Sequence, residues 1–280
     1  MPEDPVLRTL DEMTLDESFS PDFVRFQRHV LVAQRRAQAL AEELYPPPER
    51  EPNFPIDRSL VLVDPRALGV LLEELEGAPQ SASAKNPEMR ELLAGLRESP
   101  RLGEELVQAS VGRVDMLELK RLASELEVSA FGVLLVGRLV AKPFLLAALS
   151  HLAPGFEPPP LDEQTPGRCP RCDSPAAFAL LTGKEGRRQL VCGACDLRWP
   201  FHRLRCPTCQ NADGEKQGLV SLGEDKTRRL EVCEVCRRYV KTLDQRELPQ
   251  GFPVHPAIEA AASLHLDMVA ESRKYVAEVL

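Results

Sequence analysis

Apolar residues recur at helical spacing along much of the first 155 residues. From Asp22 to Leu44 they fall at every third or fourth position, which predicts an amphipathic helix with Ser20 as its N-cap and Pro21 in its first turn. Similar patterns, separated by proline and glycine, predict further helices at residues 65–76, 87–98, 104–111 and 115–126. We therefore expect this half of the chain to be a helical scaffold without chemistry of its own.

A second pattern marks the centre of that scaffold. Residues 130–152 are apolar on nearly every face, as in a buried helix, and Pro143 is expected to divide or kink it. Arg138, Lys142 and Pro143 interrupt the stretch, whereas a membrane-spanning helix needs about 20 nearly uninterrupted apolar residues. The pattern therefore predicts an interior helix and no membrane insertion.

The pattern changes after residue 154. Residues 154–166 contain five prolines, which is typical of a domain boundary. Short runs with β-propensity follow at residues 178–181, 189–191, 218–221 and 229–232, and helical spacing returns at residues 257–279. These patterns predict an α+β protein with a helical domain at 1–160, two modules at 161–201 and 202–246, and a C-terminal helix at 247–280.

Composition and charge exclude some classes of function. The 280 residues are 43% hydrophobic and 28% charged, which is enough apolar content to bury a core. The net charge of −8 argues against a general nucleic-acid binder. Residues 161–246 are locally basic, with 16 Lys and Arg against 12 Asp and Glu. Two four-thiolate sites around divalent ions, each with a net charge of about −2, would bring this segment close to neutral.

The first 17 residues are rich in acidic side chains and lack the apolar core, about 7–15 residues long, of an export signal. We therefore expect a cytoplasmic location. Reducing conditions there disfavour disulfides and favour metal thiolates.

All eight cysteines lie in four Cys-x-x-Cys pairs. The pairs are Cys169/Cys172, Cys192/Cys195, Cys206/Cys209 and Cys233/Cys236, and the intervals between them hold 19, 10 and 23 residues. Two intervening residues let one tight turn present both thiolates to the same ion. A β-hairpin in the following interval brings back a second turn that completes a tetrahedral site.

The spacing therefore predicts two sequential metal sites. The first is formed by Cys169, Cys172, Cys192 and Cys195, and the second by Cys206, Cys209, Cys233 and Cys236. Each would hold one mononuclear ion, iron or zinc, since tetrahedral sulfur suits both. Four thiolates leave no open coordination position, so a hydrolytic centre is not expected. His202 is a conceivable substitute ligand, but the cysteines already complete both sets.

Other uses of paired cysteines fit less well. Disulfides conflict with a reducing compartment, and a thioredoxin-like site needs one pair on a βαβ pattern. The spacings also differ from those of ferredoxin-type iron–sulfur proteins.

The residue after each second ligand carries a further signal. Turns of this kind usually place glycine there, because φ tends to be positive. In this chain the four positions hold Asp173, Asp196, Gln210 and Arg237. Aspartate tolerates that conformation, whereas Arg237 is a poorer fit.

The strings around the pairs are more specific than the pairs themselves. They read Cys169-Pro-Arg-Cys172, Arg188-Gln-Leu-Val-Cys192-Gly-Ala-Cys195, Arg198-Trp199, Arg203-Leu-Arg-Cys206-Pro-Thr-Cys209 and Arg229-Leu-Glu-Val-Cys233-Glu-Val-Cys236-Arg-Arg-Tyr239-Val-Lys241. With Lys142-Pro143-Phe144 and Leu264-His-Leu-Asp267-Met-Val-Ala-Glu271, they resemble the FdhE family of formate dehydrogenase accessory proteins. The resemblance covers most of the chain and is sharpest from Cys169 to Lys241.

The resemblance implies a non-catalytic, cytoplasmic maturation factor, a chaperone-like protein that binds the molybdenum-containing catalytic subunit of respiratory formate dehydrogenase. It also implies metal binding, with iron held as in rubredoxin as one proposal. The expected fold is then a helical domain, two tandem rubredoxin-like or zinc-ribbon-like modules with four cysteines each, and a C-terminal helix. Trp199, Arg203 and Tyr239 are candidate partner-binding residues, although Trp199 also fits a core position between the modules.

Two alternatives stay open at this point. A zinc ribbon could bind nucleic acid through its basic side chains, which are Arg187, Arg188, Arg203, Arg205, Arg228, Arg229, Arg237, Arg238 and Lys241. A rubredoxin-like module could instead carry electrons. The sequence decides neither between these roles nor between a monomer and a homodimer.

Overall fold

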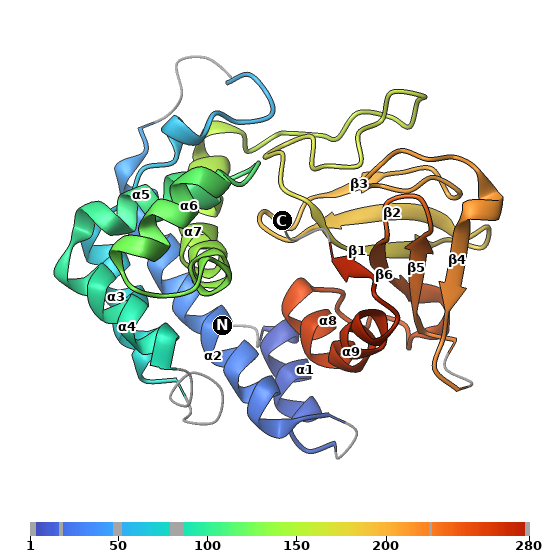
Figure 1. Ribbon diagram of the computed structural model, residues 1–280, viewed down its shortest axis with the longest axis horizontal. Coiled ribbons are helices and arrows are strands. Elements are labelled where there is room, and N and C mark those ends of the chain that lie inside the picture. Colours follow the sequence, from blue (N-terminus) through green and yellow to red (C-terminus); the bar gives the residue numbers. More distant parts are fainter. Residues whose placement is uncertain (1–3, 17–18, 47–51, 79–86, 224–225, 278–280) are drawn as a thin grey trace. The chain divides into compact units, whose positions relative to one another are not determined.

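The computed structural model describes residues 4–16, 19–46, 52–78, 87–223 and 226–277 (Figure 1). Its contacts divide the chain into two compact units, Met1–Phe156 and Glu157–Leu280. The sequence prediction set this boundary at residue 160. Three consecutive prolines at positions 158–160 follow the break directly, and proline cannot continue a helix or donate to a strand.

The N-terminal unit is helical, as predicted. Within its described residues the α-helices are α1 (Pro5–Met13), α2 (Pro21–Ala41), α3 (Pro65–Glu76), α4 (Pro87–Glu98), α5 (Pro100–Ser110), α6 (Met116–Glu125) and α7 (Ala130–Leu152). Single 3-10 turns lie at η1 (Glu42–Leu44) and η2 (Arg58–Leu60). Most of the α-helices begin with a proline, whose fixed φ and missing N–H suit the first turn.

α7 is the central helix of this unit and packs against α2, α4, α5 and α6. Its side chains Val133, Val140 and Phe144 have no exposed surface. The helix runs unbroken through Pro143, so the chain is not divided there. Among the described helices it alone is long and apolar enough to span a membrane, but 67% of its most apolar window is buried inside the fold. Packing within the unit therefore accounts for its apolar surface.

Two helix predictions need correction. α5 begins at Pro100 rather than at Glu104, because Pro100 starts the helix instead of separating two others. α1 was not expected, since nine residues give too short a periodicity to stand out. Its start is fixed by Asp4, whose carboxylate accepts hydrogen bonds from the backbone N–H groups of Val6 and Leu7.

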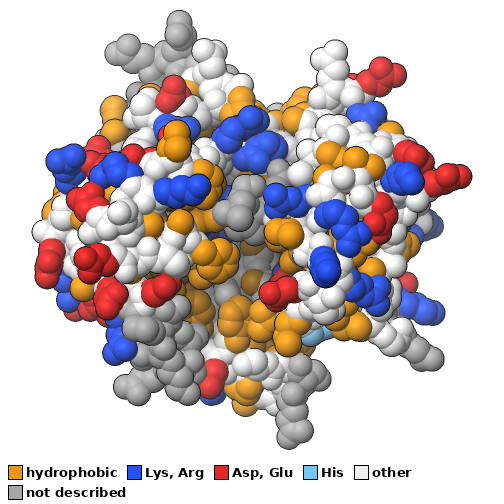
Figure 2. Space-filling model, viewed as in Figure 1, with side chains coloured by type: hydrophobic (Ala, Val, Ile, Leu, Met, Phe, Trp, Pro, Cys, Tyr) orange, Lys and Arg blue, Asp and Glu red, His pale blue; other side chains and the backbone are white. Residues whose placement is uncertain are grey.

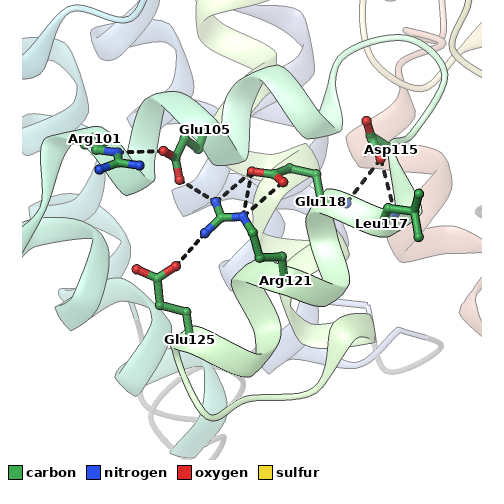
Figure 3. A network of polar contacts seen from close by, with 7 residues as sticks. All are labelled: Arg101, Glu105, Asp115, Leu117, Glu118, Arg121 and Glu125. Carbon is green, nitrogen blue, oxygen red and sulfur yellow. Dashed lines mark hydrogen bonds and ion pairs between the residues drawn. The ribbon is translucent and has the colours of Figure 1, made fainter.

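A network of charged side chains joins α5 to α6 (Figure 3). The Arg121 guanidinium on α6 pairs with Glu118 and Glu125 on its own helix and with Glu105 on α5, at 2.7, 2.6 and 2.5 Å. Arg101 pairs with the same Glu105, and the hydrogen bond that it donates lowers the pKa of that carboxyl. Because these guanidinium groups lie in solvent, the network sets the register of the two helices more than it stabilises the fold.

The C-terminal unit is built on one mixed sheet. Its strands are β1 (Ala176–Thr182), β2 (Arg187–Cys192), β3 (Arg198–Pro200), β4 (Gln217–Val220), β5 (Arg228–Cys233), β6 (Arg238–Asp244) and β7 (Val276–Ala277). The strand order is β3-β2-β1-β6-β5-β4, and β7 pairs with β6. Each half of this sheet is an antiparallel meander. The parallel pairing of β1 with β6, in which Ala179 lies opposite Thr242, joins the halves.

The two predicted modules are therefore halves of a single sheet. The runs expected to have β-structure correspond to β1, β2, β4 and β5, whereas β3, β6 and β7 were not expected. The remaining elements of the unit are η3 (Gly214–Lys216), η4 (Gln245–Glu247), α8 (Pro256–Ala262) and α9 (Leu264–Ser272).

The predicted C-terminal helical segment is present and consists of two helices, α8 and α9. The helix breaks at Ser263, whose backbone leaves the helical conformation and whose hydroxyl donates to the Glu259 carbonyl. After α9 the chain reverses and forms the short strand β7. Residues 278–280 of the predicted helix lie outside the described residues.

A buried ion pair ties the two halves of the sheet together. The Arg188 side chain on β2 is 2% exposed and lies 3.0 Å from the Glu231 carboxylate on β5. The Arg188 guanidinium also donates to the carbonyl oxygens of His202 and Arg205 in the connecting segment. The same carboxylate is approached by Arg203 at 3.2 Å and Arg229 at 3.8 Å. Glu231 therefore neutralises arginines from three segments of the unit.

Replacing Glu231 by alanine is expected to destabilise this unit by about 3–5 kcal/mol, because the buried Arg188 would lose its counter-charge. Urea unfolding of the full chain, followed by the fluorescence of the single tryptophan Trp199, measures the effect. Glu185→Ala is the matched control, since its pair with Arg187 is 3.8 Å long and both side chains are exposed. Equal unfolding midpoints for Glu231→Ala and Glu185→Ala would contradict a structural role for the buried pair.

Candidate metal centre

The four cysteine pairs form four turns, here called the first to fourth knuckles in chain order. Cys169–Cys172 precedes β1, and Cys192 is the last residue of β2. Cys206–Cys209 precedes β4, and Cys233 is the last residue of β5. The hairpins pair Ala176 with Cys192 and Gln217 with Cys233. Each hairpin therefore brings the end of its second strand back to the knuckle that precedes its first strand.

The knuckles share one backbone pattern. The first cysteine donates its N–H to the carbonyl five residues on, from Cys169 to Ser174, from Cys192 to Leu197 and from Cys206 to Asn211, each at 2.9 Å. In three knuckles the carbonyl of the first cysteine also accepts from the N–H four residues on, at Asp173, Gln210 and Arg237. Repetition of these bonds gives the turns a common shape.

The residue after each second cysteine has positive φ, as the knuckle pattern predicts. The values are 53° at Asp173, 57° at Asp196, 61° at Gln210 and 56° at Arg237. None of the four is glycine. Each therefore has a side chain in the left-handed region, which costs free energy because the Cβ crowds the backbone. At Asp173 and Gln210 the side chain makes a local hydrogen bond, with Arg168 and with the Pro207 carbonyl respectively.

The structure brings the eight sulfur atoms together as two groups of four. The first cluster is Cys169, Cys172, Cys192 and Cys195, and the second is Cys206, Cys209, Cys233 and Cys236. Within each cluster all sulfur atoms lie within 4.8 Å of one another. These are the same two sets that the spacing predicted.

The separations fit a tetrahedral ion. The Sγ atoms of Cys169 and Cys195 are 3.6 Å apart, and those of Cys172 and Cys192 are 3.5 Å apart. In the second cluster the Cys206–Cys236 and Cys209–Cys233 separations are both 3.7 Å. Four sulfurs at about 2.3 Å from a central zinc would lie about 3.8 Å from one another. Both clusters could therefore hold one metal ion each, and all eight cysteines are free thiols rather than disulfides.

Backbone N–H groups point at the sulfurs. Cys192 Sγ accepts from the N–H groups of Ala194 and Cys195, both at 3.4 Å. In the fourth knuckle burial opposes ionisation, but the N–H groups of Cys236 and Val235 donate to Cys233 and the pKa of that thiol is lowered. Such bonds favour the thiolate, the form that binds metal.

Cys169 and Cys206 need a cation to ionise. Burial raises the pKa of Cys206 to about 11, and burial together with the neighbouring Cys172 raises the pKa of Cys169. A divalent ion supplies the positive charge that holds such thiols as thiolates. Four sulfur donors close the coordination sphere of such an ion, so the arrangement suits structural support or electron transfer rather than metal-bound water chemistry.

The candidate partner-binding residues and His202 differ in their burial and in their hydrogen-bond partners. Trp199 is 1% exposed and donates from its indole N–H to the Pro166 carbonyl at 3.0 Å, so it is a core residue and not the surface residue that partner binding requires. Arg203 is partly exposed and pairs with Glu231. Tyr239 is half-buried and donates to Asp267 at 2.7 Å. His202 is bonded to the Asp162 carbonyl at 2.7 Å through Nε2 and is absent from both clusters.

Most of the arginines and lysines considered for nucleic-acid binding are paired with carboxylates. Seven of the nine have a carboxylate within 4.0 Å, namely Arg187, Arg188, Arg203, Arg228, Arg229, Arg237 and Lys241. Arg205 and Arg238 donate to backbone carbonyls instead. Acidic and basic side chains are intermixed on the face shown in Figure 2. The local excess of basic residues therefore does not form a free cationic surface in this part of the chain.

Two positions that support the clusters were missed from the sequence. Glu231 was not singled out, although it lies two residues before Cys233 and its carboxylate pairs with three arginines. Tyr275 contacts the fourth knuckle from a distant part of the sequence. The unusual Arg237, in place of a glycine, was the available signal for this second contact.

The fold and the clusters thus define a class: a helical unit followed by a sheet unit with two four-cysteine sites. No family model matches the chain. A relative from Rhizobium meliloti (strain 1021), "Protein FdhE homolog", is 28% identical over 257 residues, covering 86% of this chain and 77% of the relative. A protein of the same name from Pseudomonas aeruginosa is 32% identical over 140 residues, 45% of this chain and 44% of that protein.

The crystal structure of the FdhE protein from Pseudomonas aeruginosa has the same fold. Its TM-score is 0.61 at 20% sequence identity, with 99% of this chain and 93% of that chain covered. The predicted resemblance to the FdhE family is therefore confirmed by the curated relatives, and the α+β architecture with two four-cysteine clusters is confirmed as well.

Elemental analysis of the purified full chain is expected to give about two metal ions per chain, and about one in either Cys172→Ser or Cys209→Ser. Each substitution removes a quarter of one ligand set and leaves the other set complete. The buried Cys172 substitution should also lower the unfolding midpoint more than the exposed Cys209 substitution. A ratio of two that persists in both variants would contradict the assignment of ligands.

Proposed function

We propose that this chain is a non-catalytic, metal-binding accessory protein for the maturation of respiratory formate dehydrogenase. It acts in the cytoplasm and binds the catalytic subunit of that enzyme. The observation that carries the proposal is the pair of closed four-sulfur clusters in one sheet, on a chain homologous to FdhE proteins. Closed sulfur sites provide no position for a substrate or an activated water, which supports an assembly role over catalysis.

The clusters support a docking role through rigidity. Each knuckle is a short turn that would be mobile without a cross-link, and an ion bound by two knuckles fixes their relative positions. Arg203, between the second and third knuckles, is partly exposed and lies close to the second cluster in sequence. The sheet unit is therefore the part of the chain that we assign to partner recognition.

A rubredoxin-like electron carrier is the second candidate. It is favoured by two features of the second cluster: the backbone N–H groups that donate to Cys233, which would tune an iron centre, and the exposure of Cys209, which would give electrons access to it. Visible absorption tests this second candidate, since ferric tetrathiolate is coloured, whereas zinc is colourless and has no redox chemistry. A colourless protein that contains zinc alone would contradict it. A nucleic-acid-binding ribbon is less well supported, because seven of its nine candidate residues are ion-paired.

Pull-down from cells that express respiratory formate dehydrogenase tests the proposal. The intact chain should recover the catalytic subunit, and a Cys206→Ser, Cys209→Ser double variant should recover at least several-fold less, because the second cluster would lose its metal and its knuckles their fixed positions. The Glu185→Ala variant, altered in an exposed ion pair of the β1–β2 turn, is the control and should recover as much as the intact chain.

Equal recovery by the double variant would remove the second cluster from recognition, and no recovery by any form would contradict the partner assignment. A gel shift at low ionic strength addresses the nucleic-acid alternative. Retardation that weakens steeply with salt would favour that alternative over the accessory role.

A further inference from the structure

The two clusters differ in their access to solvent. All four cysteines of the first cluster are buried, whereas in the second cluster Cys209 is exposed and Cys236 is half-buried. The exposed apolar side chains Leu204 and Val235 flank the second cluster in sequence, one before the third knuckle and one inside the fourth. A competing ligand can therefore approach the second cluster directly, while the first requires the sheet to open.

The fourth knuckle is held from outside by the C-terminal segment Arg273–Ala277. The Tyr275 hydroxyl contacts the Glu234 carboxylate, which lies between the two cysteines of the knuckle. The Arg237 guanidinium lies 4.0 Å from the centre of the Tyr275 ring and donates to the Arg273 carbonyl at 2.8 Å. Four residues of the segment and knuckle thus form one set of contacts.

The strand β7 extends this docking. The Val276 N–H donates to the Arg237 carbonyl at 3.0 Å, and Arg238 donates to the Ala277 carbonyl at 2.7 Å. The Tyr275 ring is 9% exposed and packs in a core cluster with Leu230, Val232 and Leu266. The chain reaches this position by reversing at Lys274, which has a φ of 61°. The segment is therefore anchored at its centre by a buried ring and at its C-terminal end by β6.

These contacts explain why the fourth knuckle has arginine at a position that favours glycine. Arg237 follows Cys236 directly and has a φ of 56°, which costs free energy for any side chain with a Cβ. Its guanidinium forms the cation–π contact with the Tyr275 ring and pairs with the Glu234 carboxylate at 2.5 Å. Gln210 holds the equivalent position in the third knuckle, and its side chain bonds only to the Pro207 carbonyl of its own turn among the described contacts.

We propose that the second cluster is the exchangeable metal site of this chain, and that the docked C-terminal segment Arg273–Ala277 controls the exchange. The metal would be a divalent ion with high affinity for thiolates, such as zinc or ferrous iron. While the segment is docked, it holds the fourth knuckle in its ligating shape and slows metal loss. When the metal leaves, the knuckle loses that shape and the segment is released from β6.

The exchange is a ligand substitution without a redox change. A donor from the competing ligand forms a bond to the metal as the bond to Cys209 Sγ breaks, and the released thiolate takes a proton from water. The remaining three cysteines follow in the same way. The incoming ligand can be a chelator or the thiolate of a receiving protein.

Metal release from the zinc-loaded full chain to the coloured chelator 4-(2-pyridylazo)resorcinol tests the first part. Two phases of equal amplitude are expected, the fast one at least about tenfold faster, because local opening at an exposed site costs less free energy than opening of the buried core. Cys209→Ser should contain about one zinc per chain and release it at the slow rate. A single phase in the intact chain, or a fast phase retained in Cys209→Ser, would overturn the proposal.

Two substitutions at equivalent positions test the role of the segment. Arg237→Gly relieves the positive φ but removes three contacts: the cation–π contact with Tyr275, the hydrogen bond to the Arg273 carbonyl and the exposed ion pair with Glu234. It should accelerate the fast phase about tenfold. Gln210→Gly relieves the same strain in the third knuckle and removes one hydrogen bond within that turn, but it leaves the C-terminal segment docked, so it should change the rate much less. Tyr275→Phe, which keeps the ring and loses only the hydroxyl, should give an intermediate rate.

Hydrogen exchange of the C-terminal peptide provides a second readout. Protection of the Val276 amide should be lost when the first zinc equivalent is removed and should return when zinc is restored. Equal effects of Arg237→Gly and Gln210→Gly, or protection that does not depend on zinc, would overturn the role of the segment.

The inference rests on the metal-binding part of the proposed function. All of these measurements use the isolated chain, so failure of partner binding leaves them interpretable, and absence of bound zinc at the outset would identify a failure of the sites themselves.

Discussion

Four sulfur atoms from two separate turns must converge to within a few ångströms for one ion to bind them, and this requirement determines much of the C-terminal unit. Each turn must direct two sulfurs to one side, which the knuckle achieves with its repeated backbone hydrogen bonds and a positive φ after the second cysteine. Each pair of turns must then meet, which the β1–β2 and β4–β5 hairpins achieve through the pairs Ala176–Cys192 and Gln217–Cys233. A bound ion would add its binding free energy directly to the stability of this arrangement.

The two clusters do not act as independent modules. Their hairpins are joined by the parallel pairing of β1 with β6 and by the buried pair of Arg188 with Glu231. The backbone near the first knuckle also closely approaches the third, since a Cβ added at Gly167 would lie 1.7 Å from the Pro207 carbonyl oxygen. The two clusters therefore share one folded support, while the difference in solvent exposure keeps their exchange rates apart.

The sequence was most informative where one feature is periodic or repeated. The spacing of the cysteines predicted both groups of four sulfurs, and the helical repeat predicted α2, α3 and α7, whose buried faces are continuous. It was less informative where the structure depends on distant partners. β7 has two residues and depends on the first residues of β6, which β1 leaves unpaired, and β3 has three residues around Trp199. The break at Ser263 follows from a hydrogen bond of one hydroxyl, which no periodicity reveals. Trp199 was ambiguous because an isolated tryptophan suits both a core and a partner surface, and only its burial decides.

We propose that two ions are each bound by four thiolates and no other donor, and this proposal is the main support for an accessory role. X-ray absorption at the edge of the bound metal tests this claim on the purified full chain. The account predicts an average first shell of four sulfur atoms at about 2.3 Å, with no nitrogen or oxygen neighbour. A first shell with fewer than four sulfurs, completed by nitrogen or oxygen, would contradict it, because such a site would have room for water or a substrate.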